Sequence, residues 1–329
     1  MSDITSKLLY DSEKLVKGRR KIRGALTGFF RLVVLLSIGF IIIYPLFYML
    51  SASVAGKYAF TNSSRVWIPS EFNIVENYRV AFDCLDYGKA LLATLEYGVL
   101  PGLIQVFSCS LAAYGMARFD YFGKKIMLAF LFITIMIPDM VFIIPKMVNF
   151  SRLDFVGILG LIGKLAGKDI RPNLLDSVWA FLIPALLGVG LRSGILIFIY
   201  MQFFKGLPAE LEEAAWVDGA GPFRTFLSIA VPSSGVVIIT VTVFSLIWHW
   251  NDLINTAMLL TNKFTLSLML DGFAENLAGK HKIFLNATNP EAMSYSMAAC
   301  VLFVLPMLLF YMIVQKGFIE SIDRVGITG

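Results

Sequence analysis

Six separate runs of predominantly apolar residues, each long enough to cross a lipid bilayer, constrain the fold of this chain more than any other feature. Inside a bilayer every backbone N–H and C=O must find a partner within the protein, so apolar runs of this length form helices. Only 16% of the residues are charged and 57% are hydrophobic, which is more apolar than an ordinary soluble domain. We therefore predict an all-α integral membrane protein with six transmembrane helices. The runs cover residues 32–54, 90–116, 126–149, 175–204, 232–260 and 296–314.

Some of these helices are expected to be irregular. The fourth and fifth runs exceed the thickness of a bilayer, so they are tilted, broken or extended beyond it. Proline removes a backbone donor and kinks a helix, and Pro138, Pro184 and Pro306 lie inside the third, fourth and sixth runs.

Basic residues gather before the first run, and this asymmetry predicts the orientation of the chain. Cytoplasmic ends of membrane proteins are rich in lysine and arginine, so the N-terminus is expected in the cytoplasm, and six crossings return the C-terminus there. The net charge of +5 then needs no nucleic-acid partner. The predicted organisation is a basic cytoplasmic tail (1–31), a first transmembrane helix (32–54), an extracytoplasmic segment (55–89), a core of five further helices (90–316) and a cytoplasmic C-terminal tail (317–329).

Several segments outside the runs leave two interpretations open. Residues 1–31 form either a helix lying on the membrane surface or a solvated tail. The outer segments 151–176 and 261–295 are either small caps that meet a delivery protein or solvated loops, and His281 is expected to be solvated. The three cysteines are odd in number and scattered, so neither a disulfide framework nor a metal site is predicted.

The segment 205–232 lies between two apolar runs and carries clear helix-end signals. Pro208 suits the first position of a helix, the carboxylates of Glu210, Glu212 and Glu213 favour the positive end of its dipole, and Gly219 can end it in a left-handed conformation. A second short helix is expected from Pro222 until Pro232 stops it. The two helices form a compact projection, which either fits a groove on a partner or lies against its own bundle. Its expected apolar contacts are Leu211, Trp216, Phe223 and Phe226.

The spacing within this segment resembles the EAA loop of permease subunits of bacterial ATP-binding-cassette (ABC) importers. The matching residues are Glu213, Ala214, Ala215, Gly219, Ile229 and Pro232, with Val231 where that family usually has leucine. The stretches 111–119, 136–138, 202–204, 218–221 and 248–252 are similar to the sugar-importer branch. Together they resemble the smaller permease of a maltose-type pair. The segment 163–177 is longer than the usual connection in that family, and the C-terminus is less basic.

This resemblance implies a type I ABC importer permease fold and a division of labour in the bacterial cytoplasmic membrane. A second homologous permease completes the pore, two ATP-binding cassette subunits use ATP and magnesium, and an extracytoplasmic solute-binding protein delivers a carbohydrate. The chain itself is then neither an enzyme nor a cofactor-binding protein, and its other contacts are with membrane lipid. The residues implied in coupling to the ATPase are Glu213, Ala214, Ala215, Asp218, Gly219, Arg224, Ile229 and Pro232.

The residues themselves also argue against ATP hydrolysis by this chain. A phosphate-binding loop needs glycine five residues before the Gly-Lys pair and a hydroxyl residue after it. Neither Gly163-Lys164 nor Gly279-Lys280 has them.

Polar residues interrupt the fifth apolar run and form a candidate substrate pathway. Sugars stack on aromatic rings and hydrogen-bond through their hydroxyls, and polar residues at membrane depth face a bundle interior or a water-filled cavity. Trp248, Asn251 and Asp252 share one helix face, and Asn255 extends it by a turn. Alternatively, the tryptophans form an interfacial belt and the polar groups hold helices together. Asp139 and Glu96 each either line the pathway or lie near the outer interface.

Two other classes of membrane protein are alternatives to the importer. A secondary active transporter of a small solute would need intramembrane ion sites and usually an inverted repeat. A membrane-embedded enzyme would need a nucleophile with a base, or a metal-ligand cluster. The sequence displays neither set of features.

Overall fold

The computed structural model describes residues 2–57, 68–154, 157–285 and 289–326, and in these residues the only β pairing is an isolated bridge between Ala55 and Phe72. The predicted all-α fold is confirmed. Three helical stretches are long and apolar enough to cross a membrane by themselves: Gly24–Ser53, Tyr87–Arg118 and Glu291–Gln315. Three bent pairs of helices meet the same criterion together, which gives up to six spans among the described residues.

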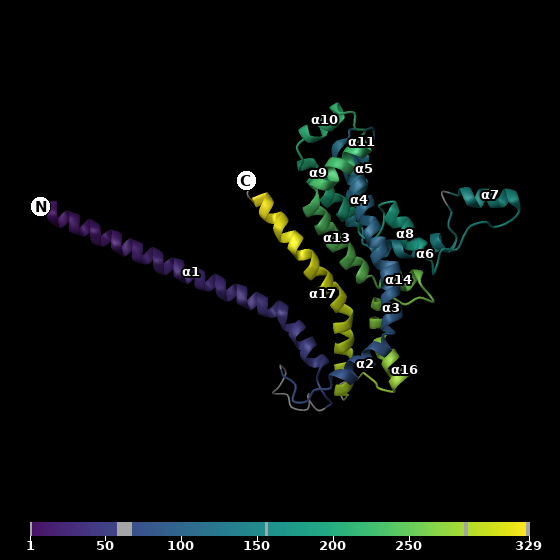
Figure 1. Ribbon diagram of the computed structural model, residues 1–329, viewed down its shortest axis with the longest axis horizontal. Helices are drawn as coiled ribbons and strands as arrows, with labels where there is room; N and C mark the ends of the chain where they lie inside the picture. The colour runs from purple at the N-terminus through teal and green to yellow at the C-terminus, as the bar shows by residue number, and fades with distance from the viewer. Residues whose placement is uncertain (1, 58–67, 155–156, 286–288, 327–329) are drawn as a thin grey trace.

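The first half of the chain contains two of the three spans that are not bent pairs, Gly24–Ser53 and Tyr87–Arg118. The helix α1 leaves the bundle and projects to one side of the molecule, whereas α4 runs through its centre (Figure 1). The elements in order are α1 (Ser2–Ser53), α2 (Ile74–Cys84), α3 (Tyr87–Thr94), the π-helical turn η1 (Leu95–Val99), α4 (Leu100–Arg118), α5 (Lys124–Met136), the 3₁₀ turn η2 (Asp139–Phe142), α6 (Ile143–Ser151) and α7 (Ile158–Ala166).

The second half of the chain packs around α4. Helices α9, α13 and α8 contact α4, and α17 lies against α1, α2 and α13. The elements in order are α8 (Trp179–Leu186), α9 (Ser193–Gly206), α10 (Glu210–Val217), α11 (Pro222–Thr225), the π-helical turn η3 (Phe226–Ala230), α12 (Val231–Ser233), α13 (Gly235–Trp250), α14 (Ile254–Leu259), α15 (Leu266–Asp271), α16 (Phe273–His281) and α17 (Pro290–Gly326).

The helix α1 is continuous across the predicted boundary between a tail and a first span. Residues 2–31 therefore belong to the same helix as the apolar run that follows. Most described side chains of α1 are exposed, and its main contacts with other described helices are to α17 and α2. Near its C-terminal end, the Tyr48 hydroxyl lies 3.8 Å from the sulfur of Met293.

Glycines allow α4 and the turn before it to approach α13 closely. A Cβ atom at Gly98 would lie 3.2 Å from the backbone oxygen of His249, and one at Gly102 would lie 3.3 Å from the Nδ1 atom of the same residue. The Ser245 hydroxyl donates to the carbonyl of Gly102 at 2.9 Å. This contact fixes α13 against the central helix, close to the point where α13 ends.

Three predicted runs are broken rather than straight. The third bends by 100° between α5 and α6, where Pro138 interrupts the backbone pairing. The fourth is divided into α8 and α9 by a connection in which Gly188 and Arg192 have positive φ angles, 68° and 52°. In the fifth run, α13 ends at Trp250 and a separate helix, α14, begins at Ile254. The breaks in the third, fourth and fifth runs open the space described below.

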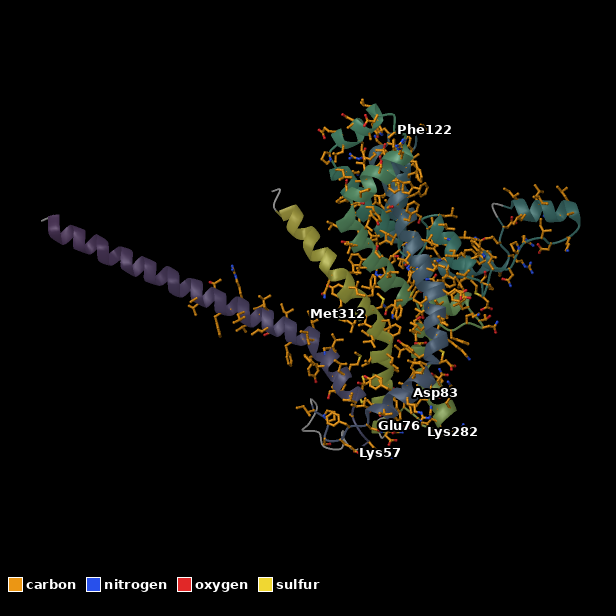
Figure 2. All side chains as sticks on the ribbon, in the orientation of Figure 1. Lys57, Glu76, Asp83, Phe122, Lys282 and Met312 are labelled. Carbon is orange, nitrogen blue, oxygen red and sulfur yellow. The ribbon has the colours of Figure 1, made fainter. Side chains whose placement is uncertain are left out.

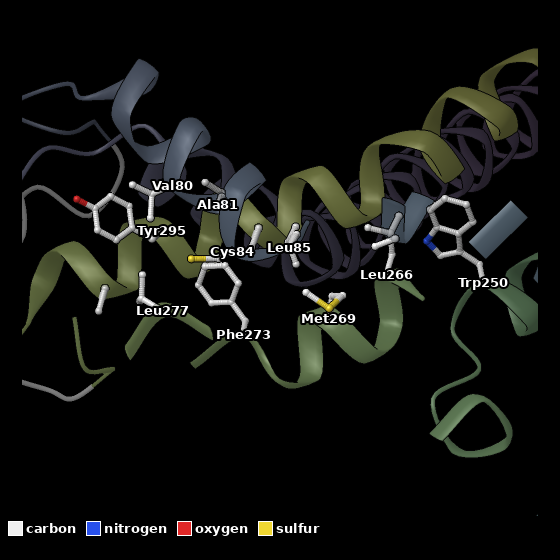
Figure 3. Close-up of a cluster of buried hydrophobic side chains, with 14 residues drawn as sticks. Val80, Ala81, Cys84, Leu85, Trp250, Leu266, Met269, Phe273, Leu277 and Tyr295 are labelled. Atoms are coloured by element: carbon white, nitrogen blue, oxygen red, sulfur yellow. The ribbon is translucent and has the colours of Figure 1, made fainter. Parts of the chain in front are cut away.

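A cluster of buried apolar side chains closes the end of the molecule that carries α2 and α16. Cys84, Leu85, Phe273 and Leu277 are among its members, and Figure 3 shows how they interlock. Burial, the largest effect, raises the pKa of the Cys84 thiol to about 11, so this cysteine is an inert packing residue. His281, which is expected to be solvated, is partly exposed, and its Nε2 atom lies 3.0 Å from an Asp83 carboxylate oxygen.

Candidate functional site

The helices α10 and α11 form the projection that the sequence predicts between residues 205 and 232. The chain turns by 78° between α9 and α10, so the projection stands at the end of the bundle opposite α2 and α16 (Figure 1). Gly219 has a φ of 80° and ends α10 as expected, because its left-handed conformation allows Ala220 N–H to donate to Ala215 O at 2.9 Å. The start differs, since α10 begins at Glu210 and Pro208 precedes it.

One turn of α10 is tied to the central helix by a buried ion pair. The Arg118 Nε atom lies 3.0 Å from a carboxylate oxygen of Glu212, and the two side chains are only 12% and 5% exposed. Arg118 also donates to the carbonyl of Leu207 at 2.7 Å. Sequence reasoning assigned Glu212 only to the helix dipole. An arginine directly after a long apolar run was the available signal for a partner.

A second attachment is made by Phe226, which is fully buried. Its ring contacts those of Tyr114 and Phe204 at centroid distances of 5.2 and 6.4 Å, so it packs against both α4 and α9. The expectation that Phe226 offers an apolar contact to a partner is therefore wrong. Its place in the apolar repeat could not distinguish an inward from an outward side chain.

The outer surface of the projection is both apolar and acidic. The large side chains of Trp216, Val217 and Phe223 are exposed. Phe122, between α4 and α5, is fully exposed at the same end of the molecule (Figure 2). Of the residues implied in coupling, Glu213, Ala214, Asp218, Gly219, Arg224 and Pro232 are exposed, whereas Ala215 and Ile229 are half-buried.

The second helix of the projection continues past the predicted stop. Pro232 lies within the short helix α12, which ends at Ser233, and the chain then bends by 85° into α13. The π-helical turn Phe226–Ala230 directly precedes this helix. A π turn shifts the backbone pairing by one residue, which accommodates a proline that has no N–H and would clash with an α-helical carbonyl.

The second site is a cavity of about 570 Å³ between the breaks in the third, fourth and fifth runs. All four residues predicted for the pathway line it: Trp248, Asn251, Asp252 and Asn255. They do not share one continuous helix, because α13 ends before Asn251. Instead, Asp252 accepts hydrogen bonds from the backbone N–H and the side-chain amide of Asn255, both at 3.1 Å, and so caps α14.

Charged residues that sequence reasoning missed or left open also belong to this cavity. Asp139 and Arg192 both line it and form an ion pair at 3.7 Å. The Arg192 guanidinium lies 5.1 Å from the centre of the Trp248 ring, a cation–π contact. Lys146 does not line the cavity itself, but it donates a hydrogen bond to the side-chain oxygen of Asn255 at 3.0 Å. Glu96 is exposed on η1 and does not line the cavity.

The size and lining of the cavity suit a small polar ligand. Ligand sites commonly have volumes of about 300–1,000 Å³ and combine apolar walls with a few placed polar groups. Here the carboxylates can accept hydrogen bonds from hydroxyl groups, and the side-chain amides can both accept and donate them. Isoleucine and leucine side chains supply the apolar part of the wall. No group of three metal-ligating side chains lies together in the described ranges.

The chain is similar to permease proteins of several bacterial sugar transport systems. It is 25% identical over 292 residues to the polygalacturonan/rhamnogalacturonan transport system permease protein YtcP of Bacillus subtilis (strain 168), covering 87% of this chain and 93% of the relative. It is 26% identical over 318 residues to the maltodextrin transport system permease protein MalD of Streptococcus pneumoniae (strain ATCC BAA-255 / R6), covering 95% and 99%.

The fold is also shared with a solved structure. A chain from the crystal structure of a bacterial ABC transporter involved in the import of the acidic polysaccharide alginate matches with a TM-score of 0.62 at 20% identity, covering 88% of this chain and 96% of that one. The predicted type I importer permease fold is thereby confirmed. The family model described as binding-protein-dependent transport system inner membrane component matches residues 106–324, which is more than half of the chain. This protein therefore belongs to that family and is a membrane-embedded transport subunit.

Proposed function

We propose that this chain is one of the two pore-forming permeases of an ATP-driven carbohydrate importer in the bacterial cytoplasmic membrane. The observation that carries the proposal is the cavity in which the predicted pathway residues meet. Its lining of carboxylates, amides and an aromatic ring fits a hydroxyl-rich solute, and the names of related permeases refer to oligosaccharides and polysaccharides. A second homologous permease provides the other half of the pore.

The projection formed by α10 and α11 is proposed to dock on an ATP-binding cassette subunit. Its exposed Trp216 and Phe223 supply apolar contacts, and the small side chain of Ala214 lets a partner surface approach the helix closely. A second ATP-binding subunit docks on the other permease, and this pair uses ATP and magnesium while the present chain binds no cofactor. Both termini and the projection then lie in the cytoplasm, and an extracytoplasmic solute-binding protein delivers the sugar at the α2 end.

The contacts of the projection explain how its movement would reach the cavity. The Arg118–Glu212 ion pair ties α10 to α4, and Phe226 ties the second helix to α4 and α9. Helix α9 continues to the N-terminal residues that line the cavity, and α13 carries Trp248. Closure of the ATPase pair therefore moves packed helices as rigid units and opens the cavity to one side of the membrane or the other.

The test is uptake of labelled oligosaccharide into proteoliposomes that contain the complete transporter with its binding protein. ATP inside the vesicles should drive uptake, and Trp248→Ala and Asn251→Ala should slow it while the subunits still assemble. Leu103→Ala is the matched control, because Leu103 is exposed on α4 outside the cavity lining. Uptake driven by a proton or sodium gradient without ATP would instead identify a secondary active transporter. Normal kinetics in both cavity variants would remove Trp248 and Asn251 from the pathway.

A further inference from the structure

The segment between α6 and α8 makes an excursion that the proposed transport function does not use. It contains the helix α7, which projects sideways from the bundle, away from the other helices (Figure 1). Backbone hydrogen bonds close its base, from Leu153 N–H to Pro172 O at 3.0 Å and from Leu174 N–H to Phe150 O at 2.8 Å. The excursion is thus built on a fixed base, and it includes most of the segment that is longer than the family's usual connection.

The interior of the excursion is closed by small residues and a capping carboxylate. Asp154 accepts hydrogen bonds from the N–H groups of Leu159 and Gly160 at 2.9 and 3.0 Å, at the start of α7. A Cβ atom at Gly163 would lie 2.7 Å from the carbonyl oxygen of Lys168, so only glycine fits where α7 meets the returning chain. The inner side of α7 is therefore hydrogen-bonded to and packed against the rest of the same excursion.

The outer side of α7 is left with four large aliphatic side chains, all exposed: Ile158, Leu161, Ile162 and Leu165. At 100° per residue they fall within one narrow face of the helix. Leu165 is 82% exposed, so no other part of the described chain buries it. This face contains no aromatic or arginine side chain of the kind that dominates protein interfaces, and it is aliphatic like the interior of a bilayer.

Positive charge flanks this aliphatic face. Between residues 151 and 175, four basic residues against two carboxylates leave a net charge of +2. Arg171 is neutralised by Asp169, with hydrogen bonds of 2.8 Å to both carboxylate oxygens. Among the described residues, no ion pair to a carboxylate involves Arg152, Lys164 or Lys168.

A hollow at the base of the excursion also combines basic and apolar side chains. It has a volume of about 780 Å³ and is lined by Arg152 and Arg171 together with apolar residues of α6, among them Ile144 and Val148. Both of these α6 side chains are exposed outward, as expected of a surface that faces lipid. The basic edge of the excursion is therefore continuous with an apolar surface of the bundle.

We propose that the excursion is a membrane-surface element that inserts the aliphatic face of α7 among lipid acyl chains and binds anionic lipid headgroups through Lys164, Lys168 and Arg152. An amphipathic helix with aliphatic residues on one side and lysine beside them binds membranes in this way. Each lysine near an anionic membrane surface raises the affinity for that surface about fivefold. The element fixes the lateral side of the permease, next to α6, to the lipid surface. This inference rests on the membrane location alone and not on the identity of the transported solute.

The test places a bimane fluorophore on the full chain and measures its quenching by brominated lipids. The probe site is Leu165→Cys, in a background in which Cys84, Cys109 and Cys300 are replaced by alanine. Leu35→Cys on the exposed apolar face of α1 is the reference inside an apolar run, and Phe122→Cys, which is exposed between two apolar runs, is the reference outside them. The protein is reconstituted in phosphatidylcholine vesicles with and without phosphatidylglycerol, both alone and in the assembled transporter.

The expected result is quenching at position 165 that matches position 35, in the isolated chain and in the assembled transporter. Brominated phosphatidylglycerol should quench more than brominated phosphatidylcholine at equal content, and Lys164→Gln or Lys168→Gln should each lower that preference about fivefold. Lys263→Gln, an exposed lysine elsewhere, should leave it unchanged. Quenching like that at position 122, or quenching lost on assembly with the second permease, would overturn the membrane assignment. A preference unchanged in both lysine variants would overturn the headgroup assignment.

Discussion

Replacing Arg118 with alanine should release α10 from the bundle. The substitution leaves the Glu212 carboxylate almost fully buried without its cation, and removes the donor to Leu207 O. Removing one partner of a buried ion pair costs about 3–5 kcal/mol. Glu212 lies in the first turn of α10, where the helix dipole returns about 1 kcal/mol to an unpaired carboxylate. We therefore expect local opening of α10 to become easier by about 3 kcal/mol, or roughly 150-fold.

Hydrogen exchange of the α10 amides in the reconstituted protein measures this opening directly. The matched control is Lys124→Ala at the same end of the molecule, because its partner Asp120 is almost completely exposed. Such surface pairs contribute about 0.2–1 kcal/mol, so exchange in α10 should hardly change. The double variant Arg118→Met with Glu212→Leu replaces the pair with apolar side chains and should restore most of the protection.

The reasoning is refuted if Arg118→Ala accelerates exchange in α10 no more than Lys124→Ala does. In that case the ion pair does not hold α10, and movement of the projection reaches α4 only through Phe226. A double variant that is as unprotected as Arg118→Ala would refute a narrower point, since the loss would then come from packing rather than from an uncompensated buried charge.

Three further substitutions test the backbone and loop contacts. Gly219→Val should destabilise the α10 end by about 1–2 kcal/mol because φ is positive there, whereas Gly221→Ala should be nearly neutral; thermal unfolding compares the two. Gly98→Ala should cost about 1–3 kcal/mol in the same assay, since the added methyl meets the backbone of His249. Hydrogen bonds from the 261–262 loop lower the pKa of the Asp176 carboxyl to about 2 from an unfolded value of about 3.9. The stabilisation of the loop by this carboxylate is therefore present above about pH 4 and lost as the pH falls toward 2. Protection of the loop amides against exchange should follow that course, and the pH dependence should disappear in Asp176→Asn.

Local signals explain which parts of the projection could be predicted from the sequence. Gly219 ends α10 because a left-handed residue is needed there, and that requirement depends only on neighbouring residues. The inward direction of Phe226 and the pairing of Glu212 with Arg118 depend on contacts between segments about ninety or more residues apart. No local pattern distinguishes those contacts from solvent exposure.

The four residues predicted for the substrate pathway line one cavity, but helical periodicity explains only part of their proximity, and their role in transport stays a prediction. Trp248, Asn251 and Asp252 were grouped by helical periodicity, yet the helix ends among them, and Asn255 joins them through the cap on α14. Arg192 was missed because it lies in the connection that divides the fourth run. A hydropathy pattern measures the length of an apolar run, and it does not locate the residues where the helix breaks to expose polar groups.

The ratio of sugar imported to ATP hydrolysed in the reconstituted transporter tests the central claim most directly. The variant Ala214→Trp places a bulky side chain on the exposed face of α10 without disturbing its buried contacts. We predict that ATP hydrolysis continues while sugar uptake falls to the background of vesicles without ATP, because the projection no longer seats on the ATP-binding subunit. Uptake at the wild-type ratio in this variant would contradict the account, since α10 would then not be the surface through which ATP hydrolysis drives transport.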